Sequence, residues 1–288
     1  MFNWISWNPS RELFYLPIVH HPITWYGVIL ALGCAIGYRI LSALYRQYFV
    51  NTVSQESDSK YSIELHVQEF CETVSIYCLF GILLGARIGH IVFYENIREY
   101  LLYPIRIFMI WEGGISSHGV IVGIAISIAC YLYRSKNSIT ISFTQMADLL
   151  VVPLTLGMAF VRVGNFINQE GIGTYTSLPW AIIFENPFGI AGGIPRHPVQ
   201  IYESIAYTGL FYWLYKLYRK NVSLLSPGKI SALFLSVGFT IRFLLEYCKQ
   251  EPIQYFYLNM GQWLSIPFII IGSFLLILRK DLLVIKNR

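Results

Sequence analysis

The sequence has few charged residues. They make up 13% of its 288 residues, whereas 55% are hydrophobic and the mean hydropathy is +0.53. Soluble domains usually contain about 25% charged residues, so a soluble globular domain describes this composition poorly. Apolar runs of roughly 20 residues recur along the whole chain, which is the length that a helix needs to cross a bilayer. The sequence therefore predicts an all-α polytopic membrane protein.

Several chemical motifs are scarce or missing. The chain has only three aspartates, Asp58, Asp148 and Asp281, far apart in sequence. A lipid enzyme that uses Mg²⁺ gathers carboxylates around the ion, so metal-assisted phosphatidyl transfer is disfavoured. The cysteines, odd in number, are scattered without metal-ligand spacing and are expected to be packing residues. We therefore expect no metal and no cofactor.

The nucleophiles of common acyl-transfer enzymes are also missing. The chain contains no G-x-S-x-G motif and no cysteine and histidine close in sequence. An acyl-enzyme intermediate therefore has no obvious nucleophile on this chain. If the protein is an enzyme, one of its substrates must supply the nucleophile.

The distribution of basic residues predicts topology rather than nucleic-acid binding. The net charge is +5, and most Lys and Arg residues fall in one set of alternating segments between the apolar runs. The positive-inside rule then places the N-terminus outside and the C-terminus in the cytoplasm. About seven transmembrane helices are predicted, at roughly 25–45, 74–94, 115–133, 148–164, 201–218, 230–248 and 262–280.

These spans predict a single integral membrane domain over residues 1–288 with two notable connections. Residues 46–73 are polar and are predicted to be a cytoplasmic loop. Residues 164–200 are rich in glycine and proline, and we expect them to fold as a small external cap.

Three arginines, Arg87, Arg162 and Arg242, lie within or at the ends of the predicted spans. An arginine at bilayer depth costs at least about 2.5–3.5 kcal/mol, so it normally faces a cavity or a partner. Because guanidinium groups match phosphate oxygens, three of them in one cavity would make a strong anion site.

Small residues recur every fourth position in three of the predicted helices. Gly81, Gly85 and Gly89 surround Arg87, and the pairs Gly33/Gly37 and Gly119/Gly123 have the same spacing. This spacing is typical of helices whose backbones approach closely. Helix packing is the simplest interpretation of these glycines.

Polar side chains cluster near the ends of several spans. Arg162 and Asn165 are three residues apart and should share a helix face. Arg242 and Glu246 are four apart and can pair, either as part of a site or as a structural ion pair between helices. Glu203 stands at the head of the fifth span, in the stretch RHPVQIYE (196–203).

Residues near the start of two predicted spans also have a structural interpretation. His118 follows Ser116 and Ser117 in a stretch of small residues, and it is either a packing residue or a functional histidine. Trp25 and Tyr26 open the first span, where aromatic residues commonly anchor a helix at the membrane interface.

Seven motifs, in order along nearly the whole chain, resemble those of the prolipoprotein diacylglyceryl transferase family of bacterial inner membranes. They are WYG (25–27), GARIGHIVFY (85–94), GGISSHG (113–119), RVGNFINQE (162–170), RHPVQIYE (196–203), RFLLE (242–246) and GQWLSIP (261–267). No single motif is decisive, but seven in the same order are highly specific.

The resemblance implies an activity and its substrates. It implies transfer of the diacylglyceryl group from phosphatidylglycerol to the lipobox cysteine thiol of a preprolipoprotein signal peptide, with release of glycerol phosphate. The partners would be this lipid, the preprolipoprotein and the surrounding membrane lipids, with no nucleic acid. A transporter or channel, whose buried Arg and Glu would line a solute path, is the alternative.

The resemblance also assigns residues. His118, Arg162 and Arg242 are the expected catalytic residues. The expected substrate-binding residues are Tyr26, Arg87, Arg162, Asn165, Glu170, Glu203 and Glu246. A free thiol has a pKa near 8.5, so thiolate formation at neutral pH needs a base or a positive field. His118 is the candidate base, and the field of Arg162 and Arg242 is the competing explanation.

The chain departs from the family's pattern at several positions. Val120, Val161 and Gln169 stand where the family often has glycine. Gly238 replaces a tyrosine that often precedes the arginine of RFLLE by four residues. Lys249 stands where an arginine is often found after Glu246.

Overall fold

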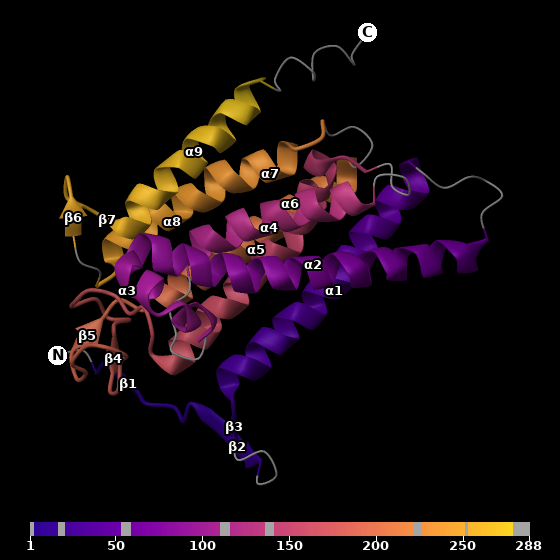
Figure 1. The fold of residues 1–288 in the computed structure, drawn as a ribbon. Coiled ribbons are helices and arrows are strands. Elements are labelled where there is room, and N and C mark those ends of the chain that lie inside the picture. The colour runs from indigo at the N-terminus through magenta and orange to yellow at the C-terminus, as the bar shows by residue number, and fades with distance from the viewer. Residues whose placement is uncertain are drawn as a thin grey trace. The chain divides into compact units, whose positions relative to one another are not determined.

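The computed structural model describes residues 3–16, 21–52, 59–109, 116–135, 141–221, 226–250 and 253–278, and it is mainly helical (Figure 1). The long helices are α1 (Trp25–Thr52), α2 (Lys60–Tyr94), α4 (Ser117–Arg134), α5 (Phe143–Asn168), α6 (Val199–Asn221) and α9 (Met260–Leu278). The shorter ones are α3 (Ile97–Leu102), η1 (Pro104–Phe108), α7 (Lys229–Leu233), the π-helical η3 (Phe234–Gly238), α8 (Phe239–Leu245) and η4 (Glu246–Cys248).

Short strands form three small sheets among the described residues. The strands are β1 (Ile5–Trp7), β2 (Glu12–Leu16), β3 (His21–Thr24), β4 (Ile182–Phe184), β5 (Pro195–Arg196), β6 (Ile253–Tyr255) and β7 (Leu258–Asn259). The first sheet has the order β1-β4-β5, with β1 parallel to β4 and β4 antiparallel to β5. The pairs β2–β3 and β6–β7 are antiparallel hairpins.

Six helices of the described residues are long and apolar enough to cross a membrane. They are Trp25–Thr52, Lys60–Tyr94, Ser117–Arg134, Phe143–Asn168, Lys229–Cys248 and Met260–Leu278. The prediction of an all-α polytopic membrane protein is therefore confirmed. Helix α6 covers the predicted fifth span but is not among the six, so the number of crossings and the orientation stay predictions.

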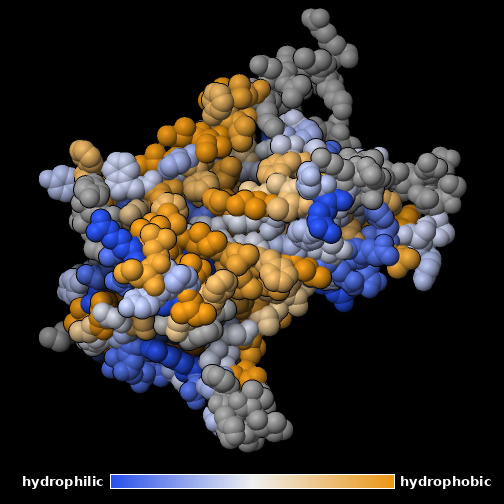
Figure 2. All heavy atoms as spheres, viewed as in Figure 1, coloured by the Kyte–Doolittle hydropathy of each residue, from blue (hydrophilic) through white to orange (hydrophobic). Residues whose placement is uncertain are grey.

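The exposed faces of these helices are rich in large apolar side chains. The outer face of α9, yellow in Figure 1, is largely orange in Figure 2, and its Phe274 and Ile277 are 58% and 62% exposed. Phe80 of α2 is 60% exposed. Apolar surface of this extent is costly in water, whereas hydrocarbon covers it at no such cost.

The chain divides into two compact units. Unit 1 comprises Met1–Leu41 and Leu150–Arg288, and unit 2 comprises Ser42–Leu149. The single integral membrane domain over 1–288 stays a prediction.

The predicted loop at 46–73 is wrong over most of its length. Helix α1 continues to Thr52 and α2 begins at Lys60, while residues 53–58 lie outside the described residues. The polar sequence remains helical because the two helices pack through aromatic rings, with the centroids of Tyr45 and Phe70 3.5 Å apart. An ion pair of 2.8 Å between Arg46 Nε and Glu64 Oε1 adds to this contact. The cytoplasmic location stays a prediction.

The segment 164–200 is folded, although its first residues belong to α5, which ends at Asn168. Strands β4 and β5 lie in it, and Ile172, Ile182 and Phe184 form a small buried cluster against Trp7 and Phe166. The indole of Trp7 donates a hydrogen bond of 3.0 Å to the Phe166 carbonyl oxygen. Strand β1 and its neighbours therefore fix the end of α5, and the external location of this cap stays a prediction.

In unit 2, helices α2 and α4 cross at the predicted glycines. A Cβ added at Gly85 would lie 2.8 Å from Gly123 Cα, and one at Gly119 would lie 2.9 Å from Gly89 Cα. Real Cβ atoms essentially never make contacts this short, so the backbones touch directly. The interpretation of these glycines as packing residues is thus confirmed.

We expect Gly119→Ala to destabilise unit 2. The added methyl group meets the backbone of Gly85 and Gly89, and overpacking of this kind costs about 1–3 kcal/mol. Thermal unfolding in detergent measures the effect. Gly157→Ala is the matched control, because no atom lies within 4 Å of a Cβ at that helical position. Equal melting temperatures for the two variants would contradict the close crossing.

Candidate functional site

The end of α5 carries a row of polar contacts. Arg162 Nη1 donates to Asn165 Oδ1 at 3.3 Å, so the two side chains share a helix face, as their spacing predicts. Asn165 Nδ2 donates to Glu170 Oε2 at 2.9 Å, and Asn168 Nδ2 donates to Glu170 Oε1 at 3.1 Å. The motif RVGNFINQE therefore orients Glu170 through two amide groups.

Gln169 makes the corner at which the chain leaves α5. Its φ is 57°, in the left-handed region that favours glycine, which explains why glycine suits this position. A residue other than glycine is strained in this conformation, and a hydrogen bond helps to stabilise it. Gln169 Oε1 accepts this bond from the Asn186 backbone amide at 2.9 Å. The Phe188 amide also donates to the Gln169 carbonyl oxygen, at 3.0 Å.

Tyr26 of α1 joins the same region. A Cβ at Gly164 would lie 2.6 Å from Tyr26 Cδ2, so the tyrosine ring packs directly on the glycine of the RVGNFINQE motif. Tyr26 also lies within electrostatic reach of Glu170 and Arg162. Tyr26 at the start of α1 therefore contacts the polar end of α5, and its interpretation as an interfacial anchor stays a prediction.

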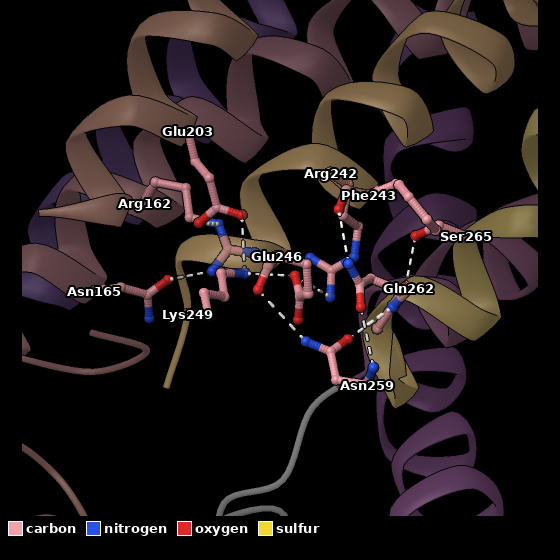
Figure 3. Close-up of polar contacts among 11 residues, drawn as sticks. Arg162, Asn165, Glu203, Arg242, Phe243, Glu246, Lys249, Asn259, Gln262 and Ser265 are labelled. Carbon is pink, nitrogen blue, oxygen red and sulfur yellow. Dashed lines mark hydrogen bonds and ion pairs between the residues drawn. The ribbon is translucent and has the colours of Figure 1, made fainter. Parts of the chain in front are cut away.

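A buried network of ion pairs links α5, α6 and the segment from α8 to Lys249. Glu203 Oε2 lies 3.1 Å from Arg162 Nε, and Glu203 Oε1 lies 3.0 Å from Lys249 Nζ. Lys249 Nζ also lies 3.0 Å from Glu246 Oε2, which is 4.0 Å from Arg242 Nη2. In Figure 3 the dashed contacts run from Arg162 through Glu203 and Lys249 to Glu246.

The network has an excess of positive charge. Three cations, Arg162, Arg242 and Lys249, meet two carboxylates in direct ion pairs, which leaves one formal positive charge. Among the described contacts, the Asn165 amide links Arg162 to Glu170. The side chain of Glu203 is 0% exposed and that of Arg162 is 17% exposed. Charges at this depth are screened little by solvent, so a net positive charge here can attract an anionic ligand.

A second set of contacts, from the start of α9, supports the end of α8. Asn259 and Gln262 bond reciprocally, since the Asn259 amide donates to Gln262 Oε1 at 3.0 Å and the Gln262 amide donates to Asn259 Oδ1 at 2.9 Å. Gln262 Nε2 also donates to the Phe243 carbonyl oxygen at 3.4 Å. Gly261 leaves room for Glu246, because a Cβ there would lie 2.7 Å from the Glu246 Cδ atom.

Two of the predicted site residues belong to unit 2. Arg87 Nη2 donates to the Arg106 carbonyl oxygen at 2.7 Å, and its Nε donates to that of Ile107 at 3.1 Å. His118 is 2% exposed and is the second residue of α4. The Ser116 hydroxyl caps this helix by accepting from the Gly119 amide at 3.3 Å. The functional roles of Arg87 and His118 stay predictions.

The structure thus brings together Tyr26, Arg162, Asn165, Glu170, Glu203, Arg242 and Glu246, all in unit 1. Lys249, Asn259 and Gln262 were not predicted as site residues. Lys249 follows Glu246 by three residues, a spacing that could have signalled their ion pair, whereas its contact with Glu203 could not be read from spacing. Gly238, at the position where the family often has tyrosine, instead faces Leu210 of α6.

The apolar helices and the ion pairs define a class of protein: a multi-pass membrane protein with a buried, cation-rich network of ion pairs. The family model of prolipoprotein diacylglyceryl transferases matches residues 13–278 of the chain. The chain belongs to this family, and it is a transferase.

Curated relatives match the chain over nearly its whole length, and each is named phosphatidylglycerol–prolipoprotein diacylglyceryl transferase. The protein of Porphyromonas gingivalis is 36% identical, over 95% of this chain and 94% of its own length. That of Tolumonas auensis is 35% identical, over 95% and 97%. That of Protochlamydia amoebophila is 31% identical, over 93% of both. These matches do not favour the transporter or channel alternative.

We expect Lys249→Met to be strongly destabilising. The variant leaves Glu203 with Arg162 as its remaining ion-pair partner and Glu246 with Arg242 at 4.0 Å. Breaking a buried pair by removing one partner costs about 3–5 kcal/mol. Thermal unfolding in detergent measures the loss, and Lys249→Arg is the control that keeps the charge. A Lys249→Met protein as stable as the wild type would show that the network contributes little.

Proposed function

We propose that the protein transfers the diacylglyceryl group of phosphatidylglycerol to the lipobox cysteine thiol of preprolipoproteins, the first step of lipoprotein maturation. The names of its relatives support this activity. The observation that carries the proposal is the buried network joining Arg162, Glu203, Lys249, Glu246 and Arg242. It supplies a localised positive charge for the single phosphate of the donor lipid.

The reaction is a displacement at carbon. The thiolate sulfur attacks the glyceryl carbon that carries the phosphate ester, and a sulfur–carbon bond forms. The bond between that carbon and the ester oxygen breaks, and its electron pair stays on the phosphate. Glycerol phosphate leaves, and the diacylglyceryl group remains on the cysteine as a thioether. The acceptor supplies the nucleophile, which agrees with the lack of one in the sequence.

In this mechanism Arg162 and Arg242 stabilise the negative charge that develops on the departing phosphate. Such a contribution is large when the donors are held in place before the reaction. The Glu203 carboxylate contacts Arg162, and Glu246 contacts Arg242, so each guanidinium has an acidic neighbour that orients it. Asn165 and Glu170 hold the glycerol head group through its hydroxyls, and Tyr26 and Arg87 are further substrate-binding residues.

Thiolate formation has two candidate explanations. His118 accepts the thiol proton as a general base, or the positive field of Arg162 and Arg242 lowers the pKa of the incoming thiol. The first predicts a pH-dependent defect when the imidazole is removed, and the second does not.

The site opens to the outer leaflet of the bacterial inner membrane in this proposal. The predicted orientation, with the N-terminus outside, puts the end of α5 and the predicted cap at 164–200 on that side. The donor lipid comes from this leaflet, and the acceptor is the signal peptide of a preprolipoprotein anchored in the same membrane.

The direct test is incubation of the purified protein with phosphatidylglycerol and a lipobox peptide, followed by measurement of the peptide's mass. The expected product gains one diacylglyceryl group on the cysteine, and glycerol phosphate accumulates in equal amount. A peptide with serine in place of the cysteine is the control and should stay unmodified. An unchanged cysteine peptide would exclude the proposed reaction.

We expect Arg162→Ala and Arg242→Ala each to abolish measurable transfer while the protein still inserts into the membrane. Removal of one donor from a site that stabilises an oxyanion costs about 10²–10³ in rate, and each arginine here contributes a full charge. The mass assay measures the loss. Arg219→Ala is the matched control, because Arg219 lies in the last turn of α6 and is exposed. Near-normal turnover in either variant would discard the proposed role.

We expect His118→Gln to lower the transfer rate at pH 7 by roughly 10²–10⁴, the usual contribution of a general base. The rate should recover at higher pH, where the thiol ionises without help. A pH–rate profile of wild type and variant makes the comparison. Parallel profiles would remove His118 as the base and favour the arginine field.

A further inference from the structure

Tyr207 is a buried residue of α6 that the mechanism above does not use. It lies four residues after Glu203, so the two side chains occupy the same face of the helix one turn apart. Its exposed fraction is 0%, and Leu210 and Leu214 further along the helix are also buried. This face of α6 lies against η3 and α8, the segment that carries Arg242.

The Tyr207 hydroxyl has no hydrogen-bond partner within the part of the chain that the structure describes. Buried hydroxyls in proteins are nearly always bonded, because burial without a partner costs free energy. A phenylalanine would fill the same space at no such cost. Packing therefore accounts for the aromatic ring of Tyr207 but not for its hydroxyl group. A bound ligand could supply the missing hydrogen-bond partner.

The surroundings of this hydroxyl identify the kind of partner. It lies within electrostatic reach of Glu203, Arg242, Arg162 and Glu246, the charged residues of the ion-pair network. Both oxygens of Glu203 already contact cations, namely Arg162 and Lys249. A phenol is a donor to any anionic oxygen that enters between these cations.

We infer that Tyr207 is a further substrate-binding residue, whose hydroxyl donates a hydrogen bond to a non-bridging phosphate oxygen of the donor phospholipid held between Arg162 and Arg242. This inference rests on the proposed function for the identity of the lipid. It adds an uncharged donor from α6 to the two guanidinium groups from α5 and α8.

The role predicts opposite effects of one substitution on stability and on binding. Tyr207→Phe keeps the ring and removes only the hydroxyl, so the lipid-free protein should melt at the same temperature as the wild type or higher. Phosphatidylglycerol should stabilise the variant less than the wild type, because one bond to the phosphate is lost. A merely structural hydroxyl would instead lower the melting temperature without lipid.

The experiment measures two quantities in detergent micelles, for the wild type, Tyr207→Phe and Tyr212→Phe. The first is the rise in melting temperature across a titration with phosphatidylglycerol, and the second is kcat/KM for transfer to a lipobox peptide. Tyr212 is the matched control, since it lies on the same helix with 55% of its surface exposed. We expect Tyr207→Phe to lower kcat/KM about 10- to 100-fold, as for the loss of a hydrogen bond to a charged group. Tyr212→Phe should behave as the wild type.

Two results would overturn the inference. One is a Tyr207→Phe protein with the lipid-induced stabilisation and kcat/KM of the wild type. The other is a fall in its lipid-free melting temperature together with the loss of transfer. Absence of transfer by the wild type would count against the proposed function alone, because the titration with lipid still reports on Tyr207.

Discussion

The buried carboxylate of Glu203 is the contact on which the rest of the site depends. It stands between Arg162 from α5 and Lys249 from the end of the α8 segment, at 3.1 and 3.0 Å. Burying a carboxylate without compensation is costly, so both cations are held where this group lies. Three segments that are distant in sequence are thereby fixed around one point. A net positive charge is thereby concentrated around this carboxylate.

Supports outside the ion pairs keep this arrangement rigid. Gln262 ties the start of α9 to the carbonyl of Phe243, and Gly261 lets that helix approach Glu246 without a clash. At the end of α5, the Trp7 indole donates a hydrogen bond to the Phe166 carbonyl oxygen, and the two rings pack in a tilted arrangement with centroids 4.5 Å apart. The functional side chains therefore stand on helices whose ends are each fixed by a separate contact, which is how a site is preorganised.

The helices, and those site contacts that join residues of one helix, could be predicted from the sequence because they depend on local spacing. Apolar runs predict spans, and pairs three or four residues apart, such as Arg162 with Asn165, predict shared faces. The helical continuation of α1 and α2 into polar sequence was missed because stacking of Tyr45 on Phe70 stabilises it, a contact between different helices. The partnership of Lys249 with Glu203 was missed for the same reason. Spacing along one helix carries no information on which helices meet.

The pairing of β1 with β4 has a consequence for biosynthesis. Strand β1 begins at Ile5, yet its partner begins at Ile182, so nearly two thirds of the chain is translated between them. The first strand cannot pair while the ribosome still holds its partner. A chain cut short before residue 182 would therefore contain α1 to α5 but would lack the strand that pairs with β1, together with Glu203, Arg242 and Lys249.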